Sequence, residues 1–180
     1  MAIRTYDDRL PVLGQRVYVD EQAAVIGDVT IGDDSSIWPF CSIRGDVNSI
    51  IIGQRSNIQD NSTIHVAHDS EYCPGGIKTV VGDDVTVGHQ VLLHACTIGD
   101  CCLIGMGSII MDNARIAPNT IIGAGSLVTQ DRELEGGFLY IGQPVRRIRK
   151  LNDEEIERIR YSAGVYLELK AQYLAQQSNT

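Results

Sequence analysis

Aliphatic residues recur at every sixth position over most of this 180-residue chain, and this period constrains the fold more than any other feature. A period of six fits neither a 3.6-residue helix nor the two-residue alternation of a strand. It predicts a solenoid in which each hexapeptide forms one short strand and one turn. The repeating positions are Val19, Val25, Ile31, Ile37 and Ile43; Ile52, Ile58 and Ile64; Val81, Val87 and Leu93; and Ile98, Ile104, Ile110, Ile116, Ile122 and Val128.

Three hexapeptides make one triangular coil, so the aliphatic residues should point inward and stack between coils. Glycine often follows the aliphatic residue, which suits tight turns. The register breaks three times: at extra residues around 48–50, at a polar loop over 66–78 that carries Pro74-Gly75-Gly76, and at one missing residue between Leu93 and Ile98. We expect a β-helix domain over residues 1–150 with an N-terminal lead-in, from which the loop bulges. Functional residues concentrate on such loops.

The repeat is expected to end near Val128, with residues 129–150 forming an irregular extended connection. Asn152 is a good helix cap, and Glu155 three residues later completes a box-like start. A helix is therefore predicted from Asp153 to about Gln176, within a segment 151–180 that packs back on the solenoid as part of the same structural unit. Its apolar face should contain Ile156, Ile159, Ala163, Tyr166, Tyr173 and Leu174.

Composition excludes several classes of function. The net charge of −8 disfavours nucleic acid as a partner, and the single basic run at 146–150 is followed by acidic residues and reads as a solvated linker. Neither a membrane-spanning apolar run nor an apolar signal core is present, so we expect a cytoplasmic protein without membrane contact. The five cysteines lack CxxC spacing, which predicts free thiols, mostly buried, with Cys73 in the loop the most reactive.

The histidines fall into this register. His65 directly follows Ile64 and His94 directly follows Leu93, so both occupy the same hexapeptide position, and Arg44 joins their column one coil earlier. Stacked coils lie about 5 Å apart, a spacing at which two imidazoles can bind one ion. Most histidines at turns are ordinary surface residues, and we expect this of His68 in the polar loop.

His89 lies five residues before His94, on the preceding side of the triangle, so it should point towards a different corner. In its own chain it is too far round the prism to join His65 and His94. In a trimer of parallel prisms, His89 of a neighbour would reach that pair. Three neutral imidazoles plus a water form the open zinc geometry used in catalysis.

Several motifs together resemble those of the γ-class carbonic anhydrases and their bacterial relatives, over roughly residues 10–175. The resemblance implies a mainly β fold, a left-handed parallel β-helix with a C-terminal α-helix packed along it; the handedness comes from the resemblance alone. It also implies a homotrimer with metal sites at the subunit interfaces, where His65 and His94 come from one chain and His89 from the next. The motifs are Arg44-Gly45-Asp46, Arg55-Ser56-Asn57-Ile58-Gln59-Asp60, Ile64-His65, Val87-Gly88-His89-Gln90, and Leu93-His94 with Cys96-Thr97-Ile98-Gly99.

The same resemblance implies a lyase that interconverts CO₂ and bicarbonate with Zn²⁺, or with Fe²⁺ or Co²⁺. It places Arg44, Asp46 and Asp60 in ion pairs between subunits. Arg44 and Asp60 are also candidate catalytic residues, and the alternative is that they only hold the subunits together. Gln59 would orient the bound hydroxide or bicarbonate, with Asn57 and Tyr166 close to the site. The candidate proton relay consists of His68, Asp69 and Glu71.

This chain departs from the family pattern where glutamates are expected. Val47 stands after the Arg-Gly-Asp motif, and the short loop has no clear equivalent of the second glutamate. These departures disfavour fast turnover. They leave open a metal-binding member without hydratase activity, acting as a thioesterase or in assembly, and a hexapeptide acyltransferase that uses one histidine without metal.

Overall fold

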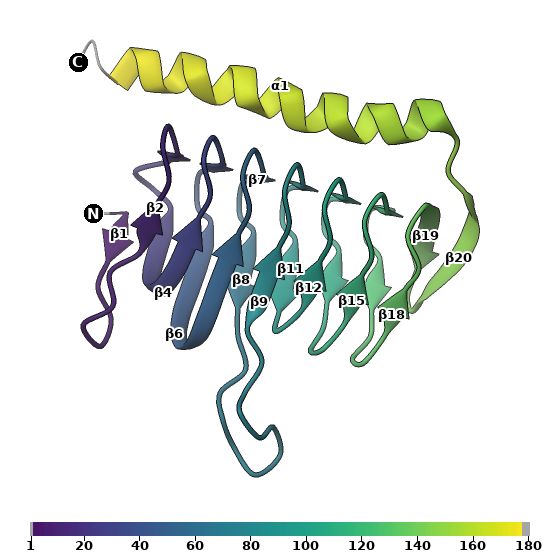
Figure 1. Ribbon diagram of the computed structural model, residues 1–180, viewed down its shortest axis with the longest axis horizontal. Coiled ribbons are helices and arrows are strands. Elements are labelled where there is room, and N and C mark those ends of the chain that lie inside the picture. The colour runs from purple at the N-terminus through teal and green to yellow at the C-terminus, as the bar shows by residue number, and fades with distance from the viewer. Residues whose placement is uncertain (1, 178–180) are drawn as a thin grey trace.

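The chain folds into a triangular prism of stacked parallel strands with one long helix along it, in a computed structural model that describes residues 2–177 (Figure 1). One face of the prism is an eight-stranded sheet. The other two faces belong to a single twelve-stranded sheet, because the long strands β4 and β6 bend from one face onto the next. The predicted fold class, a mainly β hexapeptide β-helix with a C-terminal helix, is confirmed.

From β7 to β19, each strand of the eight-stranded sheet is followed along the chain by two strands of the twelve-stranded sheet. The eight-stranded sheet contains β3 (Tyr18–Val19), β5 (Ser36–Ile37), β7 (Asn57–Ile58), β10 (Thr86–Val87), β13 (Leu103–Ile104), β16 (Ile121–Ile122), β19 (Phe138–Gly142) and β20 (Val145–Lys150). The twelve-stranded sheet contains β1 (Ile3–Arg4), β2 (Val12–Leu13), β4 (Ala24–Ile31), β6 (Ser42–Ile52), β8 (Thr63–His65), β9 (Thr79–Val81), β11 (Leu92–His94), β12 (Thr97–Ile98), β14 (Ile109–Ile110), β15 (Arg115–Ile116), β17 (Leu127–Val128) and β18 (Glu133–Leu134).

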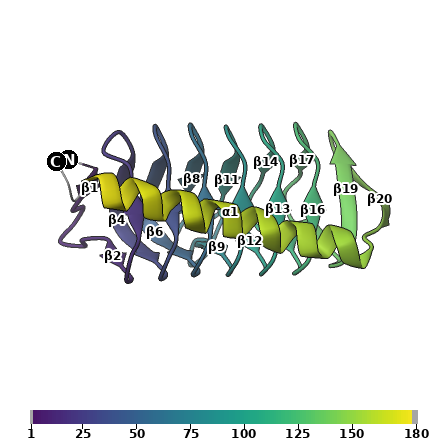
Figure 2. The same ribbon diagram turned by 90° about the horizontal axis from the view of Figure 1, so that it is seen from above.

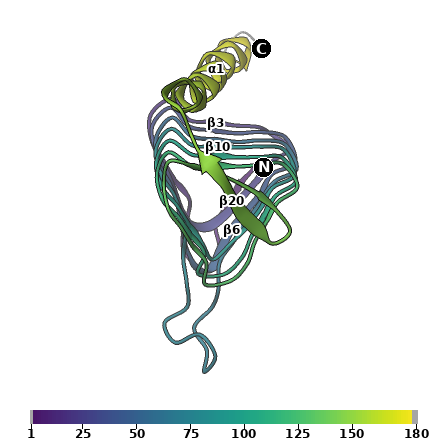
Figure 3. The ribbon, with the colours of Figure 1, turned by 90° about the vertical axis from the view of Figure 1, so that its right-hand side faces the viewer.

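Seen end-on, the prism has three faces (Figure 3). One ladder of inward aliphatic side chains on each face fills the interior. The parallel register sets each repeat residue directly on its equivalent in the next coil, so Ile43, Ile64 and Leu93 stack in one ladder. All three are fully buried. The six-residue period therefore places every aliphatic position in a dry core, and burial of this kind is the main favourable term in folding.

The repeat extends further than the sequence predicts, and residues 129–150 are not an irregular connection. β18 stacks on β15, and β19 stacks on β16 with Tyr140 in the inward position. β20 then pairs antiparallel with β19, so the basic run lies on a strand with its charged side chains exposed. The prediction was wrong because Leu134 continues the six-residue period beyond Val128, and Tyr140 then occupies the next inward position in place of an aliphatic residue.

The helix α1 (Asp153–Gln177) begins beside β20 and runs back over the eight-stranded sheet to the N-terminal end (Figures 1 and 2). Its predicted cap is confirmed, because Glu155 N donates to Asn152 Oδ1 at 2.8 Å and Asn152 N donates to Glu155 Oε2 at 3.0 Å. Ile159 and Ala163 are buried as expected. Lys170 is also buried, with Nζ donating to Asp34 Oδ1 at 2.8 Å, which fixes the helix to an early coil.

The loop between β8 and β9 leaves the prism on the side opposite the helix (Figures 1 and 3). Its base is braced by the earlier insertion, since Asn48 Nδ2 donates to Ala67 O at 3.2 Å. Cys41, Cys96 and Cys102 are buried free thiols, as expected, and burial raises the pKa of each to about 12. Among residues 2–177, no helix is long and apolar enough to cross a membrane.

Candidate metal centre

His65 and His94 lie one above the other at the ends of β8 and β11, where the sheet register pairs them directly. Their ring centroids are 5.2 Å apart and the ring planes differ by 47°. Nδ1 of His65 lies 3.2 Å from Nε2 of His94. The predicted stacking of the two imidazoles is confirmed, and the two rings turn one nitrogen each towards a common point.

A carboxylate holds the other nitrogen of each ring. Asp46 Oδ1 is 2.9 Å from Nε2 of His65, and Asp112 Oδ1 is 2.5 Å from Nδ1 of His94. An ionised carboxylate only accepts hydrogen bonds, so each ring donates its N–H to its own aspartate. The two nitrogens that face each other then carry lone pairs, which repel unless a proton or a cation lies between them.

The separation of these nitrogens suits a metal ion. Two nitrogens on one tetrahedral zinc, each about 2.0–2.1 Å from it, lie about 3.3 Å apart. The observed 3.2 Å between His65 and His94 is close to that value. Carboxylates behind ligating histidines also fix the tautomer and raise the basicity of the ring. The donor set therefore fits a divalent metal bound through these two imidazoles.

The Arg44-Gly45-Asp46 segment of β6 supplies the carboxylate that holds His65. A side chain at position 45 would place its Cβ 2.4 Å from Asp28 O, so only glycine lets β6 pass so close to β4. Burial alone would raise the pKa of Asp46, but hydrogen bonds from His65 and Arg44 outweigh it and hold that pKa below the ordinary value. Asp46 thus stays ionised as the acceptor for His65.

His89 lies at a different corner, just after β10 of the eight-stranded sheet. Its Nδ1 is 2.9 Å from Asp60 Oδ2, and its side chain is 45% exposed. Nε2 makes no hydrogen bond within residues 2–177, and the contact of Nδ1 with Asp60 fixes the tautomer of this half-exposed ring. A histidine held in this way is ready to bind a group presented from outside the chain.

The other polar residues predicted for the site gather near His89. Gln59 is 5% exposed, and its Nε2 donates to Asn57 Oδ1 at 3.1 Å. Asn57 Nδ2 in turn donates to Thr86 Oγ1 at 3.0 Å, which holds the amide chain rigid. Tyr166 of α1 packs edge-on against Trp38, and both burial and the nearby charge of Asp60 raise its pKa.

The predicted site thus divides into two halves on one chain. We call Arg44, Asp46, His65, His94 and Asp112 the paired-histidine corner, and Asn57, Gln59, Asp60, His89 and Tyr166 the single-histidine corner. Within residues 2–177, no group of three or more His, Cys, Asp or Glu side chains converges as a metal-binding cluster.

The predicted ion pairs differ from the contacts seen within one chain. Arg44 pairs with Asp46, and Asp60 pairs with His89. Both contacts are local, and the pairing of Arg44 with Asp60 between chains stays a prediction. The second predicted role of Asp46, in the same inter-subunit pairing, also stays a prediction.

The candidate proton relay lies in the protruding loop. His68, Asp69 and Glu71 are exposed, and Asp69 Oδ1 accepts a hydrogen bond from Gly75 N at 2.7 Å within the loop itself. In the part of the chain that the structure describes, no hydrogen bond or ion pair links these three side chains to His65 or His94. The relay stays a prediction.

Asp112 is the residue that the sequence reading missed. It lies 18 residues after His94, close to one coil further along. The coil is one residue short here, so Leu93 pairs with Ile110 and Asp112 stands one position beyond the column of His94. The register alone therefore does not predict it. Thr86, which anchors Asn57, carried no signal either, because a threonine in a strand is ordinary.

Comparisons with known proteins agree with this architecture. The family model described as "Bacterial transferase hexapeptide (six repeats)" matches residues 11–45 and 95–130. Protein YrdA of Escherichia coli is 52% identical over 178 residues, which is 99% of this chain and 97% of that protein. A carbonic anhydrase of Geobacillus kaustophilus is 37% identical over 95% of this chain and 90% of its own length. The mitochondrial gamma carbonic anhydrase 2 of Arabidopsis thaliana is 40% identical over 96% of this chain and 62% of that protein.

Proposed function

The chain belongs to the γ-class carbonic anhydrase-like family of hexapeptide-repeat proteins, and from this premise we propose that it is a metal-dependent enzyme that interconverts CO₂ and bicarbonate. The observation that carries the proposal is the 3.2 Å approach of His65 Nδ1 and His94 Nε2, each ring backed by an aspartate. Such an arrangement leaves two lone pairs aimed at one point, which a divalent ion satisfies.

A second copy of the chain supplies the rest of the site in this proposal. One chain offers only two converging imidazoles, while His89 stands at another corner, where Nε2 makes no hydrogen bond in the described residues. The hexapeptide family is typically trimeric. A trimer of parallel prisms would bring the single-histidine corner of one copy against the paired-histidine corner of the next, and Arg44 of one copy would pair with Asp60 of the other.

The metal, when bound, is a Lewis acid that lowers the pKa of bound water from 15.7 to about 7, which makes a nucleophile for CO₂. Zinc suits three neutral imidazoles, and Fe²⁺ or Co²⁺ also accepts this ligand type. His65, His94 and His89 would hold the ion. Asp46, Asp112 and Asp60 keep the three rings in the ligating tautomer. Gln59, fixed by Asn57, would orient the oxygen of the substrate or product by hydrogen bonding.

The test is metal content together with stopped-flow CO₂ hydration on one freshly prepared sample, once loaded with zinc and once with iron under anaerobic conditions. We expect one metal ion for each chain and hydration that disappears on chelation. Hydration that persists after complete removal of metal would contradict the proposal.

A second candidate function is that of a metal protein that does not hydrate CO₂ and acts as a thioesterase or in assembly. Two observations favour it. Val47 stands where the family pattern has a glutamate, and the loop acids and His68 make no hydrogen bond or ion pair with the paired histidines in the described residues. A protein that retains metal through dialysis but hydrates CO₂ no faster than free zinc would support this candidate. The match to the transferase hexapeptide model keeps a metal-free acyltransferase as a third candidate, which retained stoichiometric metal would exclude.

A further inference from the structure

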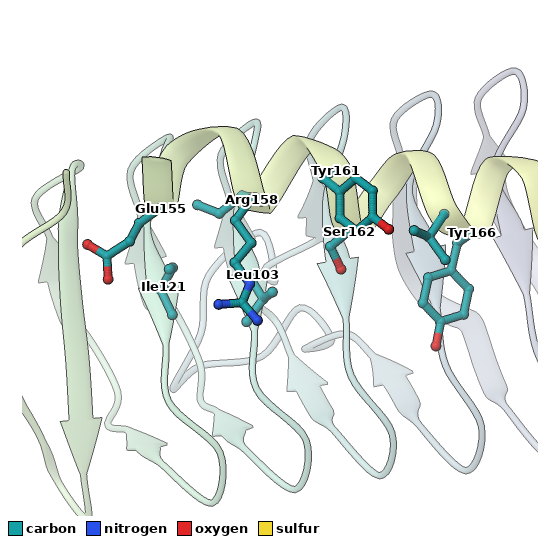
Figure 4. A pocket seen from close by; sticks show the side chains of 9 residues that line it. Leu103, Ile121, Glu155, Arg158, Tyr161, Ser162 and Tyr166 are labelled. Atoms are coloured by element: carbon teal, nitrogen blue, oxygen red, sulfur yellow. The ribbon is translucent and has the colours of Figure 1, made fainter. Parts of the chain in front are cut away.

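A cavity of about 410 Å³ lies between α1 and the eight-stranded sheet, separate from the histidines (Figure 4). Its floor consists of the outward side chains of β13 and β16, Leu103 and Ile121. Its roof consists of Ile159 and Val165 of the helix. The walls are mostly apolar, and a cavity of this size suits a small organic ligand.

Arg158 is the cationic group of this cavity. Its side chain leaves the helix and reaches down beside Leu103 (Figure 4). Its guanidinium makes no ion pair within residues 2–177. Two neighbouring arginines are engaged, since Arg160 pairs with Glu157 and Arg149 pairs with Glu155. Arg158 therefore holds five donors free above an apolar floor.

The acid that lines the cavity does not neutralise Arg158. Glu155 accepts two hydrogen bonds from Arg149, at 2.6 and 2.7 Å, and the capping bond of Asn152 N, which hold the pKa of Glu155 down to about 2. Its charge is thus already matched. Among the lining residues, Arg158 is therefore a cationic side chain that pairs with no acid in the described residues.

The far end of the cavity meets the single-histidine corner at Tyr166. Eight residues of helix separate Arg158 from Tyr166, a rise of about 12 Å. The Tyr166 hydroxyl makes no hydrogen bond within the described residues, and Figure 4 shows it and Arg158 directed to the same side of the helix. β13 pairs with β10, the strand that leads to His89, so the floor begins one coil from that histidine.

We propose that this cavity binds a medium-chain carboxylate, with the carboxylate on Arg158 and the aliphatic chain on Leu103, Ile121 and Val165. A guanidinium and a carboxylate match as a bidentate pair. The apolar walls select against small inorganic anions, which gain nothing from them. The inference does not depend on the metal, because no proposed ligand contributes to the cavity.

The experiment is a calorimetric titration of octanoate into the full-length wild-type chain and into its Arg158→Gln variant. We expect binding by the wild type and a loss of about tenfold or more in Arg158→Gln, the worth of a hydrogen bond to a charged group. Arg160→Gln is the matched control, since Arg160 lies two residues away and is paired with Glu157; it should bind as the wild type does. Val165→Phe, which fills the cavity, should abolish binding.

A neutral analogue and a phosphate analogue of octanoate separate the contributions of charge and of head-group type to binding. Octanamide should bind at least about tenfold more weakly than octanoate because it lacks the charge. Equal binding of octanamide, or unchanged affinity in Arg158→Gln, would overturn the proposal, and tighter binding of octyl phosphate would overturn the choice of a carboxylate. No heat from octanoate, together with dissociation of the oligomer in Arg158→Gln, would show that a second copy covers the cavity instead. Repeating the titration with His94→Ala keeps this result distinct from any failure of the proposed metal function.

Discussion

The paired-histidine corner and the single-histidine corner hold their imidazoles in the same way but contain different numbers of histidine rings. At both, an aspartate accepts a hydrogen bond from the imidazole, which fixes the ring. At the paired-histidine corner, two such rings converge and the His65 side chain is only 21% exposed. At the single-histidine corner, His89 stands alone and 45% exposed. A solenoid can stack two identical positions on one face, whereas a third ligand from a different face points elsewhere.

The stacking of coils therefore limits the number of histidine ligands that one prism can direct at a single metal ion. Successive coils supply neighbours about 5 Å apart along one column, but never three donors around one point. A tetrahedral site needs such a third direction. A neighbouring copy of the chain is the simplest source of the third ligand. Variants at each corner can test whether the site is divided between two copies.

The largest expected effect comes from removing one histidine from either corner. His94→Ala and His89→Ala should each abolish metal retention and any CO₂ hydration, because each leaves too few ligands. Co-expression of the two variants should restore part of both properties. A mixed oligomer can place the intact His65–His94 pair of one copy against the intact His89 of another.

Mass spectrometry of metal-loaded oligomers and stopped-flow hydration measure this recovery. His68→Ala is the control, since His68 lies in the exposed loop and should leave metal content unchanged. If His94→Ala and His89→Ala never complement each other in a confirmed mixed oligomer, the division of the site between copies is wrong.

A smaller effect is expected from the aspartates behind the rings. Asp112→Asn removes the charged acceptor of His94 Nδ1 and should weaken metal binding by about 10- to 100-fold, with the fold retained. Competition with a chromogenic chelator measures the affinity. The matched control is Asp131→Asn, since Asp131 accepts a hydrogen bond from Asn113 and touches no histidine. Equal affinities for Asp112→Asn and the wild type would mean that the paired-histidine corner needs no carboxylate.

Much of this architecture follows from the sequence, because each inward position obeys one rule of burial. The ladder of Ile43, Ile64 and Leu93 and the stacking of His65 on His94 both come from counting in sixes. The same counting failed at Tyr140, where an aromatic side chain fills the end of the prism and hides the period. At that repeat, position in the six-residue count identifies the inward residue, whereas the type of side chain does not.

The candidate site was harder to predict from the sequence, since it depends on side-chain directions that the register does not fix. The one-residue deletion before Ile98 shifts Asp112 from the column of His94, so its 2.5 Å contact is visible only in three dimensions. The burial of Lys170 in an apolar helix face likewise requires Asp34 from a coil more than 130 residues earlier, and no local pattern announces such a partner.

The pKa of Asp46 is expected to rise when Arg44 is replaced by glutamine, because the carboxylate loses a charged hydrogen-bond donor. In the folded wild type, Arg44 and His65 hold the pKa of Asp46 below its ordinary value, so the stability from its ionised form is present at neutral pH and lost as the pH falls through that lowered pKa. Without Arg44, burial raises the pKa, and the loss begins at a higher pH. A carboxyl-carbon NMR titration of metal-free protein measures it, with Asp34, whose pKa Arg16 and Lys170 lower, as the unaffected reference.

The smallest effect should come from the hydroxyl of Tyr166, beside the single-histidine corner. Tyr166→Phe keeps the ring that packs 5.6 Å from Trp38, and the hydroxyl has no hydrogen-bond partner in the described residues, so the thermal midpoint should not change. If that hydroxyl instead contacts substrate or product in the assembled site, its loss removes one ordinary hydrogen bond and should slow hydration by about two- to tenfold. The split between kcat and KM identifies its partner: a change in KM alone assigns uniform binding, and a change in kcat alone assigns a contact made in the transition state. Unchanged kinetics in Tyr166→Phe would leave Tyr166 a packing residue, and the single-histidine corner would then act through His89, Asp60 and Gln59 alone.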